Sequence, residues 1–326
     1  MPDRRLKRGK SACAAGAVVV LAAAAFFSLA GAAPLAGSVR PLLRVDLRLT
    51  SSARIQPRPL VITLGGPVYC GQVTAIVNYL HASLVCPDYG RDGERSGASR
   101  ARRVEDWGNP AYLDAVARIP DQLERKGLKV SELILVGASY AGYAAAELVA
   151  THPGLHPRAL VIVDSFLDLR ARFRALAPGQ PTRTEMIHVL GGTPAQRPRA
   201  YATRSPSAHL AGLAAAVEHG TRFVDVWSVG VAAAHEFRNA MCSRLANALW
   251  LRRLAHLVHR PVTGYVTRLR HARALWDWWR QLLALAGLAT TSHRLPAATF
   301  TFQQGKTLSP GSYCGAAPRT LLRTQH

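Results

Sequence analysis

A serine lies between two segments of opposite character in the sequence LVGASYAG at 135–142. The apolar run SELILVG at 131–137 predicts a buried strand, and the residues after Ser139 have helical spacing. A serine at the apex of so tight a turn exposes its hydroxyl beside a helix N-terminus, where backbone N–H groups favour developing negative charge. Such a hydroxyl can attack a carbonyl carbon once a base removes its proton. The alternative is a helix-capping serine without a chemical role.

This segment resembles the nucleophile elbow of the α/β-hydrolase family, whose motif is G-x-S-x-G. Gly137 and Ser139 match the motif, whereas its last position is Ala141, with Gly142 following. Alanine is small enough to permit the turn. The resemblance covers roughly residues 42–290 in strand order. It implies the α/β-hydrolase fold, a mostly parallel sheet flanked by helices, with Ser139 as the nucleophile.

A second part of the resemblance concerns the loop after an earlier strand. That strand ends in Leu64-Gly65-Gly66-Pro67, where the family commonly has His-Gly-x-Pro. The resemblance therefore assigns the oxyanion-binding N–H groups to Gly66 and to Tyr140, which follows the serine. Leu64 replaces the usual histidine, and a plain Gly-Pro turn is the alternative interpretation.

The base is expected after the last core strand, because the family order is serine, acid, histidine. His271 lies in the predicted loop between the strand at 260–266 and the last helix, so the resemblance assigns the base to it. The chain contains 12 histidines, and His235 and His209 are the alternatives.

The acid is harder to assign. The turn after the strand at 222–228 contains no carboxylate before Glu236, although the family usually has one there. Some members use an acid after the preceding strand, which here is Asp164. We therefore expect Asp164 to be the acid, with Glu236 as the alternative. Asp164 could equally be a loop-fixing or helix-capping carboxylate, and a chain without the acid would be a slow enzyme or a binding protein.

The predicted elements alternate between strands and helices, which indicates a mostly parallel sheet covered on both faces. Pro120 is expected to kink or split the helix predicted at 111–127. Strands are predicted at 42–50, 59–64, 83–86, 131–137, 159–165, 222–228 and 260–266, and helices at 73–82, 111–127, 140–153, 235–256 and 272–287.

Residues 166–221 interrupt this alternation with arginines, a Pro/Gly-rich middle and weak periodicity. An insertion of this length between two core strands predicts a cap or lid over a site. The expected organisation is an N-terminal segment at 1–32, the α/β-hydrolase domain at 42–290 and a polar tail at 291–326.

Composition favours a packed globular protein, since 49% of the residues are hydrophobic and 18% are charged. The formal net charge of +22 suggests nucleic-acid binding. However, the charges are scattered and form no zinc-finger, RNP-type or basic-region pattern. We therefore expect no nucleic-acid partner, and instead a small-molecule or acyl substrate and a loose affinity for anionic groups.

The N-terminus has the three parts of a secretory signal peptide: a basic start, an apolar middle and the small residues Ala30-Gly31-Ala32. An uncleaved membrane anchor is the alternative, since the uncharged stretch is long enough to span a bilayer. Its alanine-rich middle favours cleavage. We expect a secreted or cell-envelope protein, with the membrane involved only through this segment if it is retained.

Export would leave four cysteines in an oxidising compartment, Cys70, Cys86, Cys242 and Cys314, which allow three pairings. No CxxC pair is present, so two disulfides are expected rather than a zinc site. In the fold that the resemblance implies, the strands ending at Leu64 and Cys86 are neighbours. That arrangement implies a Cys70–Cys86 bridge and, with it, a Cys242–Cys314 bridge.

Together these features predict an exported serine hydrolase that cleaves an ester, thioester or amide through an acyl-enzyme, with a carboxylic ester as the first expectation. The resemblance implies no metal and no organic cofactor. An aminopeptidase of the same fold, suggested by the Gly-Gly-Pro loop, and a non-catalytic envelope binding protein are the alternatives.

Overall fold

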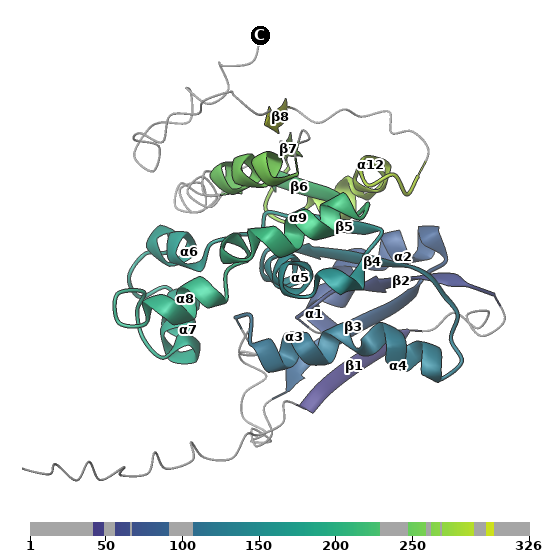
Figure 1. The fold of residues 1–326 in the computed structure, drawn as a ribbon, viewed down its shortest axis with the longest axis horizontal. Helices are drawn as coiled ribbons and strands as arrows, with labels where there is room; N and C mark the ends of the chain where they lie inside the picture. The colour runs from purple at the N-terminus through teal and green to yellow at the C-terminus, as the bar shows by residue number, and fades with distance from the viewer. Residues whose placement is uncertain are drawn as a thin grey trace, which may run out of the picture. The chain divides into compact units, whose positions relative to one another are not determined.

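The computed structural model describes residues 42–48, 56–65, 67–90, 107–228, 247–258, 262–267, 269–289 and 298–302 (Figure 1). All of them belong to one compact unit, Arg40–His326. The predicted N-terminal segment at 1–32 lies outside the described residues, as do His235, Glu236, Cys242, Cys314 and Gly66. No helix within the described part of the chain is long and apolar enough to cross a membrane.

Eight strands of the described residues form one sheet with the order β1-β3-β2-β4-β5-β6-β7-β8. The six central strands are parallel, and β1 and β8 pair antiparallel at the two edges. The strands are β1 Leu42–Arg48, β2 Arg58–Ile62, β3 Ser83–Gly90, β4 Val130–Ala138, β5 Ala159–Val163, β6 Arg222–Ser228, β7 Val262–Thr267 and β8 Ala298–Phe302. This arrangement confirms the predicted α/β-hydrolase fold class. The edge strand β8 was not predicted within the tail.

The central strands are apolar because helices cover both faces of the sheet. In β4, Leu133 and Leu135 belong to one buried core, whereas Ile134 and Val136 belong to the other. The first core packs under α3 Pro110–Ala117, α4 Ile119–Arg125, α5 Tyr140–Thr151 and the helical residues 247–257. The second core packs under α1 Pro67–Cys70, α2 Thr74–Leu80, α11 Ala274–Asp277 and α12 Trp279–Leu285.

The starts of α3 and α4 follow common local signals. Asn109 caps α3 by accepting a hydrogen bond from the N–H of Ala111 at 3.0 Å, and Pro110 occupies the first turn. Pro120 lies in the first turn of α4, which confirms the predicted split of the 111–127 segment.

The prediction of one helix over 272–287 is wrong, because the segment breaks into α11 and α12 at Trp278. The backbone of Trp278 is not helical, with φ −135° and ψ 18°. Its side chain is buried in the second core with Leu275 and Leu282. Tertiary packing thus overrides local helical periodicity at this bulky residue.

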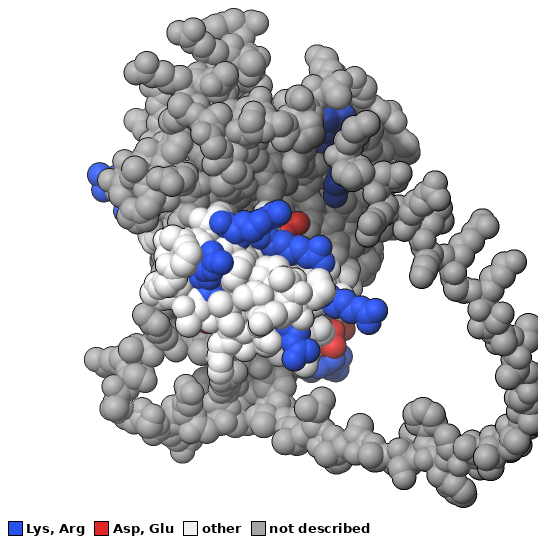
Figure 2. Space-filling model, turned by 90° about the vertical axis from the view of Figure 1, so that its left-hand side faces the viewer, with Lys and Arg blue, Asp and Glu red and all other residues white. Residues whose placement is uncertain are grey.

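The interval 166–221 contains four α-helices, α6 Leu169–Ala175, α7 Pro181–Leu190, α8 Pro198–Thr203 and α9 Leu210–Glu218, and the short 3-10 helix Pro206–Ala208. α9 packs closely on α5, since a Cβ at Gly212 would overlap the carbonyl oxygen of Ala150. α6, α7 and α8 lie together at one side of the sheet (Figure 1). Basic side chains outnumber acidic ones on the described part of this side (Figure 2). The covering of a site by residues 166–221 stays a prediction.

Candidate active site

Ser139 occupies the sharp turn between β4 and α5. Its backbone has φ +52° and ψ −119°, a conformation that costs an L-residue about 1–3 kcal/mol. The Ser139 N–H donates to the carbonyl of Val163 in the neighbouring strand at 2.8 Å. The serine is half-buried between two fully buried neighbours, Ala138 and Tyr140. Strand and helix thus hold the residue in a strained turn while leaving part of its surface accessible.

Two glycines make this turn possible. A Cβ at Gly137 would lie 2.6 Å from the backbone carbon of Ala141, so only glycine lets the strand and helix meet here. A Cβ at Gly142 would overlap the Oγ of Ser165, which follows β5. The glycine that the motif lacks at position 141 is therefore required one residue later, where the loop after β5 approaches α5.

Asp164 lies at the end of β5 and bridges the ends of two other strands. Its Oδ1 accepts a hydrogen bond from the N–H of Ser228 in β6 at 2.5 Å. Its Oδ2 accepts from the N–H of Ala272, in the turn after β7, at 2.7 Å. The carboxylate is therefore a loop-fixing group, one of the roles expected for it. The same bonds hold its Oδ2 next to the backbone of His271.

His271 lies in the loop between β7 and α11, and its ring faces Asp164. The distance from His271 Nδ1 to Asp164 Oδ2 is 3.9 Å, with the two side chains 55% and 7% exposed. A hydrogen bond requires an approach of about 1 Å from this separation. Catalytic hydrogen bonds often shorten only when substrate binds, so a separation of 3.9 Å is compatible with the predicted pairing.

The sheet brings Ser139, Asp164 and His271 to the same side, where its parallel strands end. β4, β5, β6 and β7 are adjacent and parallel, so their carboxyl ends lie together. Ala138 pairs with Val163, which makes Ser139 and Asp164 the next residues along two neighbouring strands. This edge is where open parallel sheets bind ligands and present catalytic groups.

The other predicted candidates are placed differently. His209 lies at the start of α9, where its Nε2 is 3.5 Å from Glu147 Oε1 and 2.9 Å from the carbonyl of Thr203. Tyr140 is the first residue of α5, so its N–H is at the helix N-terminus beside Ser139. Gly66, His235 and Glu236 are not among the described residues.

An aromatic cluster beside Ser139 was not predicted. Trp107 packs on Tyr140, Tyr143 and Phe166, with ring centroids 5.7, 6.2 and 5.7 Å away. The cluster also joins α5 to the interval 166–221, because Tyr143 donates its hydroxyl proton to the Arg204 carbonyl at 2.6 Å. Aromatic pairs of this kind contribute about 0.5–1.5 kcal/mol beyond the burial of their surface, so the cluster stabilises the packing beside Ser139.

A buried acid lies in β6 among apolar neighbours. Asp225 has no exposed surface, and burial raises its pKa well above the ordinary value. The nearby Asp164 charge raises the pKa further, while hydrogen bonds from the side chains of Trp227 and Asn247 lower it. The only sequence signal is an aspartate inside the apolar strand RFVDVWS.

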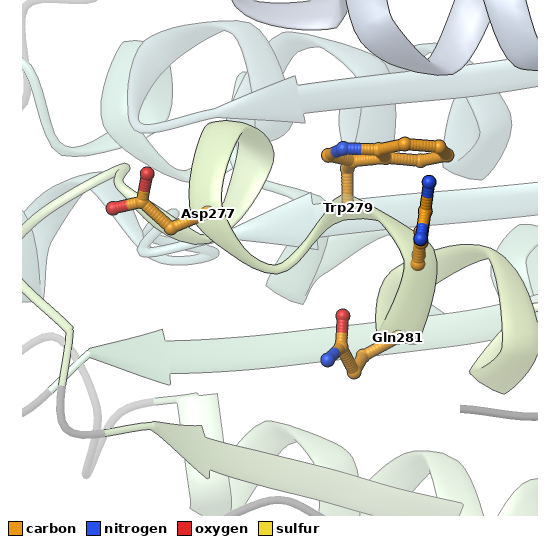
Figure 3. Close-up of a pocket in the computed structure, with 4 residues that line it drawn as sticks. Asp277, Trp279 and Gln281 are labelled. Atoms are coloured by element: carbon orange, nitrogen blue, oxygen red, sulfur yellow. The ribbon is translucent and has the colours of Figure 1, made fainter. Parts of the chain in front are cut away.

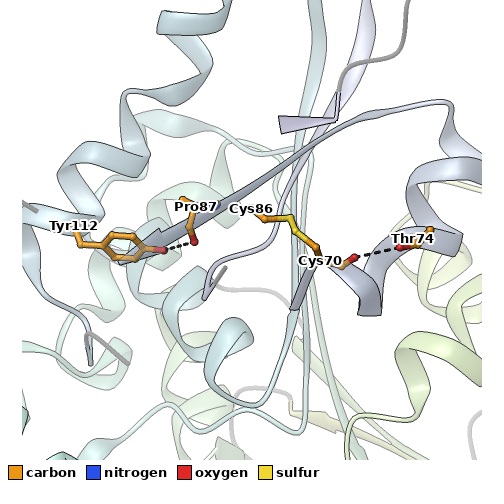
Figure 4. The surroundings of a disulfide bond; sticks show 5 residues. All are labelled: Cys70, Thr74, Cys86, Pro87 and Tyr112. Atoms are coloured by element: carbon orange, nitrogen blue, oxygen red, sulfur yellow. Dashed lines mark hydrogen bonds between the residues drawn. A yellow bond between two sulfur atoms is a disulfide. The ribbon is translucent and has the colours of Figure 1, made fainter. Parts of the chain in front are cut away.

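A disulfide joins Cys70 to Cys86, as expected (Figure 4). The Cα atoms are 5.9 Å apart, and the bridge links α1 to β3. On one side, the Thr74 hydroxyl donates to the Cys70 carbonyl at 3.3 Å, and on the other, the Tyr112 hydroxyl donates to the Pro87 carbonyl at 2.9 Å. The bridge thus anchors the segment that follows the predicted oxyanion loop.

A pocket of about 270 Å³ lies on α11 and α12, lined by Asp277, Trp279, Arg280 and Gln281 (Figure 3). The Arg280 guanidinium lies 5.1 Å from the Trp279 ring centroid. The lining includes none of the candidate catalytic residues. Within the described part of the chain, no group of three or more His, Cys, Asp or Glu side chains could hold a metal ion.

No protein-family model and no curated protein sequence matches the chain. Solved structures do resemble it. That of MPT51 (FbpC1) of Mycobacterium tuberculosis is 18% identical to this chain with a TM-score of 0.49, and the match covers 75% of this chain and 91% of that one. Carboxyl esterase 2 from the fungus Tuber melanosporum is 17% identical with a TM-score of 0.45, over 69% and 70% of the two chains. An S-formylglutathione hydrolase from Agrobacterium tumefaciens is 13% identical with a TM-score of 0.48, over 75% and 90%. These three proteins are members of the α/β-hydrolase fold.

Proposed function

We propose that the protein is an exported serine hydrolase that cleaves an ester, thioester or amide bond through an acyl-enzyme on Ser139. The observation that carries this proposal is the backbone of Ser139, which is held at φ +52° between β4 and α5. Strain of this kind persists where the surroundings enforce it, and it is typical of functional sites.

In the proposed reaction, His271 accepts the proton of the Ser139 hydroxyl as the oxygen bonds to the substrate carbonyl carbon. The N–H groups of Tyr140 and Gly66 then stabilise the oxyanion, each worth about 2.7–4 kcal/mol in the transition state. The protonated His271 gives its proton to the leaving group as the bond to the carbonyl carbon breaks. Water, or another acceptor in an acyltransferase, releases the acyl group by the same steps in reverse. No metal ion or organic cofactor takes part in this mechanism.

The proposed acid is Asp164, because its Oδ2 lies 3.9 Å from His271 Nδ1. A carboxylate in this position orients the imidazole and stabilises the imidazolium that forms during the reaction. Glu236, at the more common position after β6, is the second candidate. Replacing each in turn distinguishes them, since loss of the orienting acid lowers the rate by on the order of 10⁴.

Export is part of the proposal. It is supported by the basic-apolar-small pattern of residues 1–32 and by the Cys70–Cys86 disulfide, which is typical of oxidising compartments. Mass determination of the mature protein tests it: a chain that begins after Ala32 supports cleavage, and an intact N-terminus supports a membrane anchor.

The central experiment is labelling with a fluorophosphonate probe, which reacts with activated serines. We expect labelling of the folded protein that disappears in Ser139→Ala and persists in the control Ser207→Ala, a partly buried serine near α9. Unlabelled folded protein would instead support the non-catalytic binding protein. Panels of esters and aminoacyl amides then separate an esterase from an aminopeptidase.

A further inference from the structure

One side-chain amide holds the loop that follows Asp164. Asn247 is fully buried at the start of the helical residues 247–257. Its Nδ2 donates to the carbonyl of Ser165 at 2.8 Å, and its Oδ1 accepts from the N–H of Leu167 at 3.1 Å. A single residue thus fixes one carbonyl and one N–H group within the three residues after Asp164.

Asn247 is in turn positioned by a buried acid in the sheet. Its Nδ2 lies 3.5 Å from Oδ2 of Asp225, which has no exposed surface. Burial raises the pKa of Asp225 well above its ordinary value, which favours a neutral carboxyl group. A neutral carboxyl can lie in an apolar strand and still accept a hydrogen bond from the amide. The amide therefore connects β6 to the loop after β5.

The position of this loop determines the position of the candidate acid. Ser165 is bonded directly to Asp164, so displacement of the loop moves the carboxylate. The carboxylate accepts hydrogen bonds from Ser228 and Ala272 and faces His271 at 3.9 Å. Because the separation of 3.9 Å already exceeds hydrogen-bonding distance, a displacement of the loop away from His271 would put a hydrogen bond between the two side chains further out of reach.

We propose that Asn247 is a positioning residue of the candidate active site, because its amide holds residues 165–167 and thereby directs the Asp164 carboxylate toward His271. This inference rests on the proposed function of Ser139. Asparagine suits the role because one short side chain supplies both the donor and the acceptor that the loop backbone requires. Leucine has a similar size but neither a hydrogen-bond donor nor an acceptor in its side chain.

The experiment compares the full-length wild type with Asn247→Leu, Asn247→Gln and the control Leu254→Ala. Leu254 is also fully buried in the segment 247–257, but its side chain has no hydrogen-bonding group. The rate constant kinact and the binding constant KI are measured for a fluorophosphonate probe. Hydrogen exchange is measured at the amides of Leu167 and Ala272.

In Asn247→Leu we expect kinact to fall by about 100-fold with KI unchanged, because misplaced catalytic groups slow the reaction step. Exchange at both amides should accelerate at least about tenfold, since each loses its support. Asn247→Gln keeps the amide on a longer side chain, so its kinact should fall less. Leu254→Ala should keep the wild-type kinact even where it lowers stability, which separates positioning from a structural role.

A wild-type kinact in Asn247→Leu would overturn the positioning role. If that variant does not fold, Asn247→Gln decides, and a wild-type kinact with unchanged exchange overturns the inference. An equal loss of kinact in Leu254→Ala also overturns it, because the effect would then follow stability. A wild-type protein that the probe does not label overturns the proposed function and, with it, the role of Asn247.

Discussion

Ser139, Asp164 and Ala272, which follow β4, β5 and β7, have a positive φ without being glycine, at 52°, 52° and 60°. Ser139 carries the candidate hydroxyl and Asp164 the candidate carboxylate, and Ala272 is the residue after His271. Each conformation costs about 1–3 kcal/mol, and such strain persists only where surrounding bonds enforce it. The backbone N–H of each donates a hydrogen bond to a neighbouring strand or to Asp164 itself. Two of these strained residues, Ser139 and Asp164, carry groups that the proposed mechanism uses, and the third follows His271 directly.

Replacement of Gly142 tests the close packing of α5 against the loop after β5. An alanine within a helix normally stabilises it by about 1 kcal/mol relative to glycine. At position 142, however, a Cβ would overlap Ser165 Oγ and lie 2.7 Å from the Gly137 carbonyl oxygen. We therefore expect Gly142→Ala to lower the free energy of unfolding by about 1–3 kcal/mol. Urea denaturation of the purified protein measures the change.

The matched control is Gly154→Ala, since a Cβ there meets no atom within 4 Å. Its free energy of unfolding should stay within about 0.5 kcal/mol of the wild type. The double variant Gly142→Ala/Ser165→Gly should recover part of the loss, because it removes one of the two overlaps. A Gly142→Ala protein as stable as the wild type would contradict the packing described here.

At the scale of elements, β6 combines a buried acid with a role in the site. Asp225 pairs with Ile162 of β5 and with Gly264 of β7, so it lies in the middle of the sheet. The strand end, Ser228, donates its N–H to Asp164. β6 therefore supports Asp164 in two ways: directly through the N–H of Ser228 at its end, and indirectly through Asp225 in its middle, which contacts Asn247.

Asp225→Asn should change how stability depends on pH. The pKa of Asp225 is raised in the folded protein and is about 3.9 in the unfolded chain. Between these two values the folded state binds the proton and the unfolded state does not. The free energy of unfolding therefore falls as pH rises, by about 1.4 kcal/mol per pH unit for this group. Asparagine cannot ionise, so the variant should gain stability relative to the wild type as the pH rises above about 4.

Urea denaturation at pH 4.5, 6 and 7.5 (values of about this spacing suffice) measures the difference between the two proteins. Asp121→Asn, which replaces an exposed acid in the first turn of α4, controls for the loss of any carboxylate. A constant difference between wild type and Asp225→Asn across this range would show that Asp225 is ionised in the folded protein.

At the scale of the whole molecule, the Cys70–Cys86 disulfide links two elements of the fold covalently. The Cys70–Cys86 disulfide closes a chain segment with a sequence separation of 16 and joins α1, on one face of the sheet, to β3. A closed loop of this length contributes about 3 kcal/mol by restricting the unfolded chain. The segment begins just after the predicted oxyanion loop.

The free energy of unfolding of the double variant Cys70→Ser/Cys86→Ser should therefore be about 2–4 kcal/mol lower than that of the oxidised wild type. Both proteins are compared by urea denaturation without reductant, and the slope of the transition reports any change in the unfolded state. Reductant should then destabilise the wild type by a larger amount than the double variant. Equal stability of the two proteins would show that the bridge does not restrict the unfolded chain.

Much of this fold could be predicted from local patterns. The apolar runs that became β2, β4, β5 and β6 are short and continuous, as expected for strands covered on both faces. Pro120 was expected to split a helix and does so between α3 and α4. Local periodicity was insufficient at Trp278, where packing breaks a helix, and in the tail, where ATFTF pairs with β7.

For the candidate site, the sequence by itself determined the groups on the strand ends, because the turn that carries Ser139 and the residues after each strand are local features. The tertiary structure alone decided which of them meet. The bond from Ala272 to Asp164 spans 108 residues, and that from Leu167 to Asn247 spans 80. Hydrogen bonds over such separations follow from the order and register of the strands, which bring distant backbone together. No spacing within a single segment records that order, so the support of Asp164 by Asn247 could be seen only in the folded chain.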